Sequence, residues 1–165
     1  MALVYRAVRQ KYATQPLDTR GTWLNGGRWN PPGVGLLYTA EHAALALVEI
    51  LVHMPQVLYA DLPSFRLFTL ELPDDSIRVL RAGQLPPYWQ DDNYSHSQTI
   101  LADWLAQPDV VALGVPSSVM PDGINYVLHS DHPAYASIRV MEEKALLIDP
   151  RLWSRQEYQM GRIDA

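Results

Sequence analysis

Short runs of apolar residues, several of them alternating with polar ones, recur along this chain and predict strands. The clearest runs cover residues 3–8, 63–72 and 110–115, which are rich in valine, leucine or phenylalanine. Shorter runs of the same kind cover residues 36–38, 76–80, 125–128, 136–141 and 145–148. Prolines, glycines and polar residues separate these runs and favour turns. The pattern therefore predicts about six to eight strands, none of them long.

A different spacing predicts a helix over residues 40–54. Apolar residues occupy nearly every position from 43 to 52, which is more typical of a buried helix than of a surface helix. Thr39 is placed to cap the N-terminus of this helix, Glu41 suits its first turn, and Pro55 ends it. A second, amphipathic helix is expected over residues 97–106, and Pro108 is expected to stop it.

Glu49 is the one acidic residue inside the apolar part of the first helix. A carboxylate in such a place is costly unless it is paired, hydrogen-bonded or facing a wet cleft. At helical spacing Glu49 shares a face with His42 and His53, so this face is either part of a functional site or a thin solvated seam. The pattern alone leaves both interpretations open.

The order of the elements predicts the class of fold. Strands and helices do not alternate as regular strand–helix–strand units, which favours an α+β fold with short mixed or antiparallel strands and a few helices. Residues 9–25 are expected to form a polar loop and residues 86–97 an aromatic and polar one. We find no internal repeat or linker, so a single domain is expected over residues 1–165.

Composition narrows the function classes. Charged residues make up 19% and hydrophobic residues 48% of the chain, which is typical of a folded globular protein. The net charge of −5 gives no electrostatic footprint for direct contact with nucleic acid or with an anionic membrane. The chain has no cysteine, no signal-peptide pattern and no run long enough to span a bilayer, so the cytoplasm is the expected location.

The densest candidate chemistry lies at residues 26–33, which read Gly-Gly-Arg-Trp-Asn-Pro-Pro-Gly. The two glycines allow close approach of the backbone to a ligand, and the prolines force a turn directly after Arg28, Trp29 and Asn30. Arg28 is therefore expected on a stiff loop. Alternatively, Arg28 has a purely structural role and forms a salt bridge from this loop to the sheet.

Several familiar motifs are absent or weak. There is no phosphate-binding loop of the GxxxxGK[ST] type and no GxGxxG turn. His129 and His132 lie three residues apart in a predicted turn, where hydrogen bonding within the turn is favoured over metal binding. No GxSxG motif surrounds Ser117, so a structural turn serine is favoured there over a hydrolase nucleophile. No metal site is predicted.

Read in order, several short motifs resemble those of the RES domain, the toxin half of bacterial Xre–RES toxin–antitoxin pairs. The motifs are the segment at 26–33, Leu-Tyr-Thr-Ala at 37–40, Ala-Leu-Val-Glu at 46–49, Val-Pro-Ser at 115–117, Asn-Tyr-Val-Leu at 125–128 and Asp-Pro-Arg-Leu at 149–152. The arginine, glutamate and serine that name the family match Arg28, Glu49 and Ser117, and Tyr38 matches a fourth active-site residue. His129-Ser130 departs from the family pattern, which continues with Asn-Pro.

This resemblance implies a fold like that of ADP-ribosyltransferase toxins and breakdown of NAD as substrate, with no cofactor. Cleavage at the nicotinamide–ribose bond needs a carboxylate for the developing positive charge, a cation for the pyrophosphate and an aromatic surface for the base. Glu49, Arg28 and Tyr38 suit these three roles, although Tyr38 could also be a half-buried strand residue. Ser117 could hydrogen-bond a ribose or amide group. The expected substrate-binding set further includes Arg6, Trp29, Asn30 and Asn125.

The acceptor of ADP-ribose is expected to be water or inorganic phosphate, the latter as a co-substrate. The resemblance also implies a partner, an Xre-type antitoxin with a helix-turn-helix region, in a complex that can hold more than one copy of this chain. An acidic chain that leaves DNA contact to its partner fits this picture. Two alternatives remain open: a toxin that ADP-ribosylates a host enzyme, and a non-catalytic module that binds a nucleotide or a partner.

Overall fold

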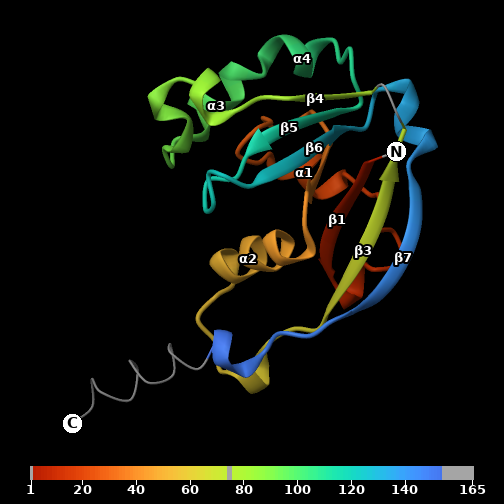
Figure 1. Cartoon of the computed structure of the whole chain (residues 1–165), viewed down its shortest axis with the longest axis vertical. Helices are drawn as coiled ribbons and strands as arrows, with labels where there is room; N and C mark the ends of the chain where they lie inside the picture. Colours follow the sequence, from red (N-terminus) through yellow and green to blue (C-terminus); the bar gives the residue numbers. More distant parts are fainter. Residues whose placement is uncertain (1, 74–75, 154–165) are drawn as a thin grey trace.

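The computed structural model describes residues 2–73 and 76–153, in which seven strands form one mixed sheet (Figure 1). The strand order is β4-β5-β6-β2-β1-β3-β7, and of the pairs in this order β4 with β5 is parallel and the others are antiparallel. This confirms the α+β prediction. The strands are β1 (Ala2–Arg9), β2 (Leu36–Ala40), β3 (Phe65–Leu72), β4 (Ile77–Val79), β5 (Ala112–Pro116), β6 (Ile124–His129) and β7 (Arg139–Leu146).

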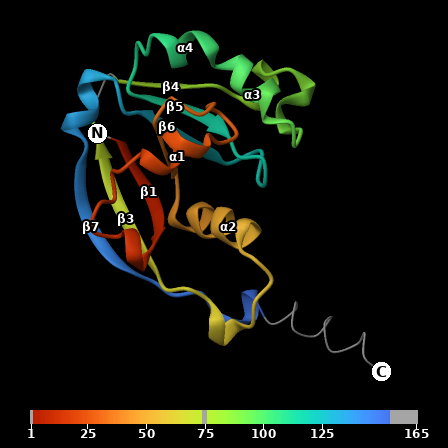
Figure 2. The ribbon, with the colours of Figure 1, turned by 180° about the vertical axis from the view of Figure 1, so that it is seen from behind.

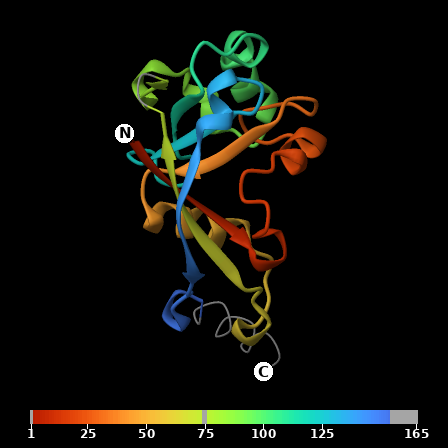
Figure 3. The same ribbon diagram turned by 90° about the vertical axis from the view of Figure 1, so that its right-hand side faces the viewer.

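Four α-helices surround this sheet in the described residues: α1 (Arg20–Asn25), α2 (Ala43–His53), α3 (Tyr94–Ile100) and α4 (Ala102–Ala106). Helices α3 and α4 lie over the β4–β5 end of the sheet, and α2 lies beside β1 (Figures 1 and 2). The long antiparallel strands β3 and β7 extend between the end that carries α3 and α4 and the opposite end of the molecule (Figure 3). None of these helices has the length and apolar character needed to cross a bilayer.

Four predicted elements differ from those of the structure. The expected polar loop at 9–25 contains α1, and the expected helix over 97–106 is interrupted at Leu101, where α3 ends and α4 follows. The two strands expected at 136–141 and 145–148 are one strand, β7, preceded by a 3-10 helix at Pro133–Ser137. The charges in the middle of β7 do not interrupt it, because an edge strand can point charged side chains into solvent while pairing on one side.

Helix α2 also differs from its prediction. It begins at Ala43, with His42 at the N-cap position, because Thr39 remains in β2 and donates its hydroxyl proton to the Tyr126 carbonyl oxygen. Glu41 lies before the helix, where its Oε1 accepts a hydrogen bond from the Ile124 amide at 2.7 Å. Only Leu45 and Ala46 of α2 are buried, so the expectation of a helix buried on all sides was wrong. One face packs on β1 and β2, and the other is left open.

The sheet parts between β1 and β2, and this parting positions the candidate site. These two strands pair only at Tyr5 and Ala40, whereas β1 pairs with β3 along its full length. Just past that single pair, Arg6 Nη1 donates to the Tyr38 carbonyl oxygen at 2.9 Å and replaces the missing strand contact. Helix α2 lies beside the place where the two halves of the sheet separate (Figures 1 and 2).

Three apolar clusters hold this arrangement. One lies on the sheet face opposite α2 and includes Val4, Phe68 and Leu70. Another surrounds Trp29, whose ring stacks on that of Trp89 with centroids 6.1 Å apart, under α3 and α4. The third packs the buried residues of α2 on the sheet. The Trp29 cluster matters most for the site, because it fixes the loop that carries Arg28.

Candidate functional site

Two adjoining cavities open between α2, β2 and the loop at 26–33. The first, called here the Arg6 lobe, has a volume of about 330 Å³ and is lined by Arg6 and by small or apolar residues of β1, β2 and α2. The second, the Arg28 lobe, has a volume of about 320 Å³ and is lined by residues 26–29, Tyr94 and Ser118. Both lobes share the residues Tyr38, Glu49, His53 and Asn125 as walls. The lobes therefore form one cleft that has Glu49 at its middle and an arginine on each side.

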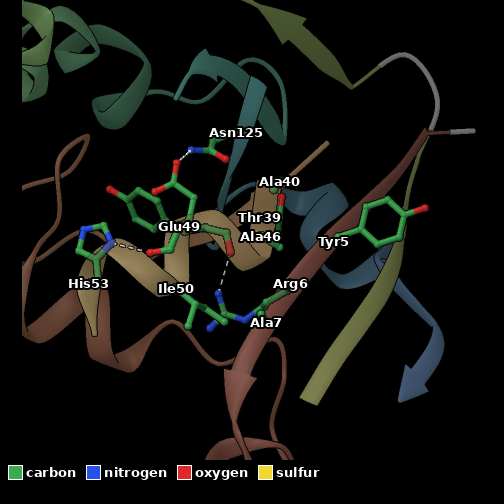
Figure 4. A pocket seen from close by; sticks show the side chains of 11 residues that line it. Tyr5, Arg6, Ala7, Thr39, Ala40, Ala46, Glu49, Ile50, His53 and Asn125 are labelled. Carbon is green, nitrogen blue, oxygen red and sulfur yellow. Dashed lines mark hydrogen bonds between the residues drawn. The ribbon is translucent and has the colours of Figure 1, made fainter. Parts of the chain in front are cut away.

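The Glu49 carboxylate is held by two donors on one oxygen. Its Oε1 accepts from Ser117 Oγ at 2.7 Å and from Asn125 Nδ2 at 2.6 Å (Figure 4 shows the second bond). Within residues 2–73 and 76–153, Oε2 receives no hydrogen bond, so this oxygen is free to act on a ligand. Glu49 thus lines a cleft with its orientation fixed, and it is not part of a solvated seam on α2.

Ser117 supports Glu49 from behind. It is completely buried, and its Oγ also accepts from the Val119 and Met120 amides at 3.1 and 3.0 Å. The hydroxyl therefore caps the turn after β5 and aims its single proton at Glu49. The expected contact of Ser117 with a ribose or amide group of the substrate does not fit this position, because no part of Ser117 is exposed to either lobe.

The Tyr38 hydroxyl is occupied by the loop. It accepts from the Trp29 amide at 3.0 Å and donates to Asn30 Oδ1 at 2.8 Å. Burial raises the pKa of Tyr38 above its usual value, so the phenol stays neutral. Gly27 is required beside it, since a Cβ there would lie 2.7 Å from the Tyr38 hydroxyl oxygen. Tyr38 can therefore offer its ring face to a ligand, whereas its hydroxyl proton is already donated to Asn30.

Arg28 lies at the outer wall of the cleft. Its Nη1 donates to the carbonyl oxygens of Asp91 at 2.8 Å and Trp89 at 3.4 Å, and its guanidinium carbon lies 4.6 Å from the ring centroid of Tyr94. In the described part of the chain it pairs with no carboxylate, so the salt bridge considered from the sequence is not seen. A guanidinium with carbonyl and aromatic partners keeps its positive charge available to an anion.

Arg6 is a second cation without a carboxylate among the described residues. Desolvation by burial lowers the pKa of Arg6 to about 10, which still leaves the guanidinium charged at neutral pH. Its Nη1 donates to the Tyr38 carbonyl oxygen, and its buried Nε has no hydrogen-bond partner in the part of the chain that the structure describes. The side chain points into the cleft from β1 (Figure 4).

Two further candidates prove to be supports of the loop. Asn30 is completely buried, and its Nδ2 donates to the carbonyl oxygens of Val34 at 2.8 Å and Thr22 at 3.2 Å. Trp29 is 3% exposed and packs in its tryptophan cluster. Asn30 lines neither lobe, whereas Trp29 is among the residues that line the Arg28 lobe. Sequence reasoning could identify the loop but not how deeply each of its side chains is buried.

His53 was missed as a site residue. It lines both lobes, and its Nδ1 lies 2.7 Å from the Glu49 carbonyl oxygen, one helical turn back. That contact fixes the ring, because a carbonyl oxygen only accepts and Nδ1 must therefore carry the proton. The signal was present in the sequence, since residues four apart on a helix share a face.

The departure at His129-Ser130 has a local explanation. His129 is buried, its Nε2 contacts the Leu105 carbonyl oxygen at 3.0 Å, and its Nδ1 accepts from the Asp131 amide at 3.2 Å. Ser130 donates its hydroxyl to the Gly35 carbonyl oxygen at 2.9 Å. His132 Nδ1 accepts from the Ala134 amide at 3.1 Å. Both histidines serve the turn by hydrogen bonding, as predicted, and this turn lies outside the two lobes.

We expect Ser117→Ala to lower the free energy of unfolding by about 1–3 kcal/mol, because the buried amides of Val119 and Met120 lose their acceptor. Thermal unfolding followed by circular dichroism measures this as a fall in Tm. Ser118→Ala is the matched control, since the neighbouring Ser118 is only partly buried, and it should change stability by about 0.5 kcal/mol or less. Equal losses in both variants would contradict the supporting role of Ser117.

The sequence of this chain matches a known family over nearly its whole length. The model of the family described as "RES domain" matches residues 3–149. A protein of Yersinia enterocolitica named "Toxin Res" is 30% identical over 152 residues, which cover 91% of this chain and 99% of that protein. A protein of Sphingobium sp. named "Prs ADP-ribosylating toxin" is 32% identical over 146 residues, which cover 86% of this chain and 89% of that protein.

A solved structure shares the fold. It is described as the crystal structure of the M. tuberculosis MbcT-MbcA toxin-antitoxin complex, and the likeness has a TM-score of 0.69. The match covers 95% of this chain and 89% of that chain at 21% sequence identity. At this identity the likeness shows a shared arrangement of the strands and helices.

Proposed function

This chain belongs to the RES domain family, and we propose that it is the toxin of a toxin–antitoxin pair that cleaves NAD between nicotinamide and ribose. The names of its relatives support the toxin assignment. The single observation that carries the chemistry is the fixed carboxylate of Glu49, with one oxygen held by Ser117 and Asn125 and the other left free between two cationic lobes.

Glu49 is suited to the bond that breaks. When the bond between ribose C1′ and the pyridine nitrogen breaks, its electron pair leaves with nicotinamide and positive charge develops at C1′ and the ring oxygen. A carboxylate oxygen beside that centre stabilises the charge, most strongly where water is scarce. Because Oε1 is already hydrogen-bonded, the free Oε2 is the oxygen that faces the ribose in this proposal.

The Arg28 lobe is suited to the pyrophosphate. Arg28 brings a planar guanidinium without a carboxylate partner in the described residues, and it lies at the wall of this lobe beside Tyr94. The neutral ring of Tyr38 provides an apolar surface between the lobes. The acceptor that then takes ADP-ribose is water or inorganic phosphate, in the cytoplasm where NAD is abundant.

A protein acceptor is the second candidate, and one relative favours it. The Sphingobium protein that is 32% identical to this chain is named an ADP-ribosylating toxin. The same cleft would then bind NAD and pass ADP-ribose to a side chain of a host enzyme. Tyr94, which is exposed and lies against Arg28, gives this rim the aromatic character common in protein contacts.

The proposed partner is an Xre-type antitoxin with a helix-turn-helix region, in a complex that can include more than one toxin copy. The neighbour in fold was solved as a toxin–antitoxin complex, which supports a protein partner for this chain. The net charge of −5 suits a protein that leaves DNA to a basic partner. Co-expression with the adjacent antitoxin gene should restore growth that this chain arrests.

Nicotinamide release from NAD by the purified chain tests the function. We expect release, with ADP-ribose as product in plain buffer and its phosphorylated form if phosphate is the acceptor. A parallel reaction with labelled NAD and a bacterial lysate should leave protein unlabelled, and label that accumulates on one protein would favour the second candidate. Binding of NAD without any release or label would mean a non-catalytic module.

A further inference from the structure

Two buried side-chain atoms in the described part of the chain have no hydrogen-bond partner, and both belong to residues of the Arg6 lobe. They are Nε of Arg6, on β1, and Oδ1 of Asn125, on β6. These strands are not neighbours, because β2 lies between them. Unpaired buried polar atoms are rare in native proteins and call for an explanation, such as a ligand that completes them.

The hydrogen-bonding role of each of the two atoms, as donor or as acceptor, follows from the contacts around it. Asn125 must point its Nδ2 at Glu49, because a carboxylate oxygen only accepts, and its Oδ1 therefore faces the other way as an acceptor (Figure 4). Arg6 is anchored through Nη1 to the Tyr38 carbonyl, and its Nε is always a donor. The lobe thus offers one unpaired donor and one unpaired acceptor.

We propose that the Arg6 lobe binds the nicotinamide end of NAD and recognises its carboxamide through these two atoms. The carboxamide oxygen accepts from Arg6 Nε, and a carboxamide N–H donates to Asn125 Oδ1. Ala7, Ala40, Ala46 and Ile50 supply apolar walls for the pyridine ring. The inference rests on the proposed function, and it assigns the specificity for the base to two residues.

This assignment also fixes the direction of the substrate. With the base in the Arg6 lobe, the first ribose lies at Glu49 and the pyrophosphate enters the Arg28 lobe. A nicotinate end has no hydrogen for Asn125 Oδ1 and would leave that acceptor unpaired, whereas its carboxylate charge would be attracted by Arg6 and repelled by Glu49. Discrimination between the amide and the acid therefore rests on Asn125 in this proposal.

The test compares kcat/KM for NAD with kcat/KM for its 3-acetylpyridine analogue, in which a methyl group replaces the amide nitrogen. The two bases differ in intrinsic reactivity, but this difference is the same for every variant. The quantity compared is therefore the ratio of the two kcat/KM values in each variant, relative to the same ratio in the wild type. We expect Asn125→Ala to lower the NAD preference about tenfold relative to wild type, because only NAD loses a contact there. Arg6→Lys should lower the preference for NAD over its thionicotinamide analogue in the same way, since sulfur is a weak acceptor.

Ser117→Ala is the matched control. It removes the other donor to Glu49 Oε1 from a residue that lines neither lobe, so it should slow both substrates and leave their ratio within about twofold. Asn125→Ser serves as a second variant in case Asn125→Ala does not fold. A ratio that Asn125→Ala and Asn125→Ser leave at its wild-type value would overturn the proposal.

A binding measurement separates this proposal from the proposed reaction. Free nicotinamide should shift the Asn125 side-chain amide signals in a ¹⁵N NMR spectrum of the wild-type chain, and 3-acetylpyridine should do so more weakly. If nicotinamide shifts them but NAD is not cleaved, the proposed reaction fails and the lobe assignment stands. If nicotinamide leaves them unmoved, the lobe assignment is overturned whether or not NAD is cleaved.

Discussion

Glu49→Gln should slow nicotinamide release from NAD by about 10²–10³-fold while the fold stays intact. Glutamine has the same size as glutamate, and its Oε1 can still accept from Ser117 Oγ and Asn125 Nδ2. What disappears is the negative charge on the free oxygen that faces the ribose. The loss should fall on kcat rather than on KM, because the charge is needed where positive charge develops in the transition state.

Release of nicotinamide, followed by chromatography at saturating NAD, measures this effect. Glu41→Gln is the matched control, because Glu41 lies just before α2, lines neither lobe and would keep its contact to the Ile124 amide. It should retain activity within about twofold of wild type. Wild-type turnover by Glu49→Gln, with an unchanged Tm, would remove Glu49 from the mechanism.

Sequence reasoning located the site because its chemistry interrupts local patterns. Glu49 breaks an apolar helix, and Arg28 follows two glycines and precedes two prolines. Both irregularities lie within one segment of chain, and the structure places Arg28, Tyr38 and Glu49 around one cleft. Such residues can be predicted because their oddity is visible without knowing what packs against them.

The sequence could not predict in the same way which of these side chains are buried and which reach the cleft. Asn30 and Ser117 were expected to touch the substrate, yet both are buried and bind backbone groups that come from other parts of the chain. The place of Arg6 depends on β1 and β2 separating after one pair. These facts belong to tertiary packing, which one residue's identity and spacing do not encode.

The predicted elements failed for similar reasons. Helix α2 looked buried all round, but the sheet covers only one face, because the cleft occupies the space beside it. The strand β7 looked like two strands because its charged middle breaks the apolar pattern, although an edge strand tolerates such charges. In both cases the residue pattern was identified correctly, but the elements packed beside α2 and β7 determined how much of the helix is buried and how far the strand extends.

Asn30→Asp should cost about 3–5 kcal/mol of unfolding free energy and lower Tm by about 10 °C. The Asn30 amide group lies among carbonyl oxygens, to which its Nδ2 donates: those of Val34 at 2.8 Å and Thr22 at 3.2 Å. Aspartate has the same shape but would place a second oxygen, carrying charge, against these acceptors in a fully buried position. The Tyr38 hydroxyl, which donates to Asn30 Oδ1, cannot satisfy both oxygens.

The pH dependence of that loss distinguishes charge from shape. Burial among carbonyl oxygens, with the Tyr38 hydroxyl as a single neutral donor in the described residues, raises the pKa of the new carboxyl above its unfolded value, so the folded variant binds a proton more readily than the unfolded chain does. The variant should therefore gain stability relative to wild type as the pH falls, because a protonated carboxyl can donate again. Asn25→Asp is the matched control, since Asn25 is exposed and makes one bond, to the Gly21 carbonyl at 3.0 Å. Its cost should stay below about 1 kcal/mol, and an equal, pH-independent loss in both variants would mean that Asn30 does not hold the loop through buried hydrogen bonds.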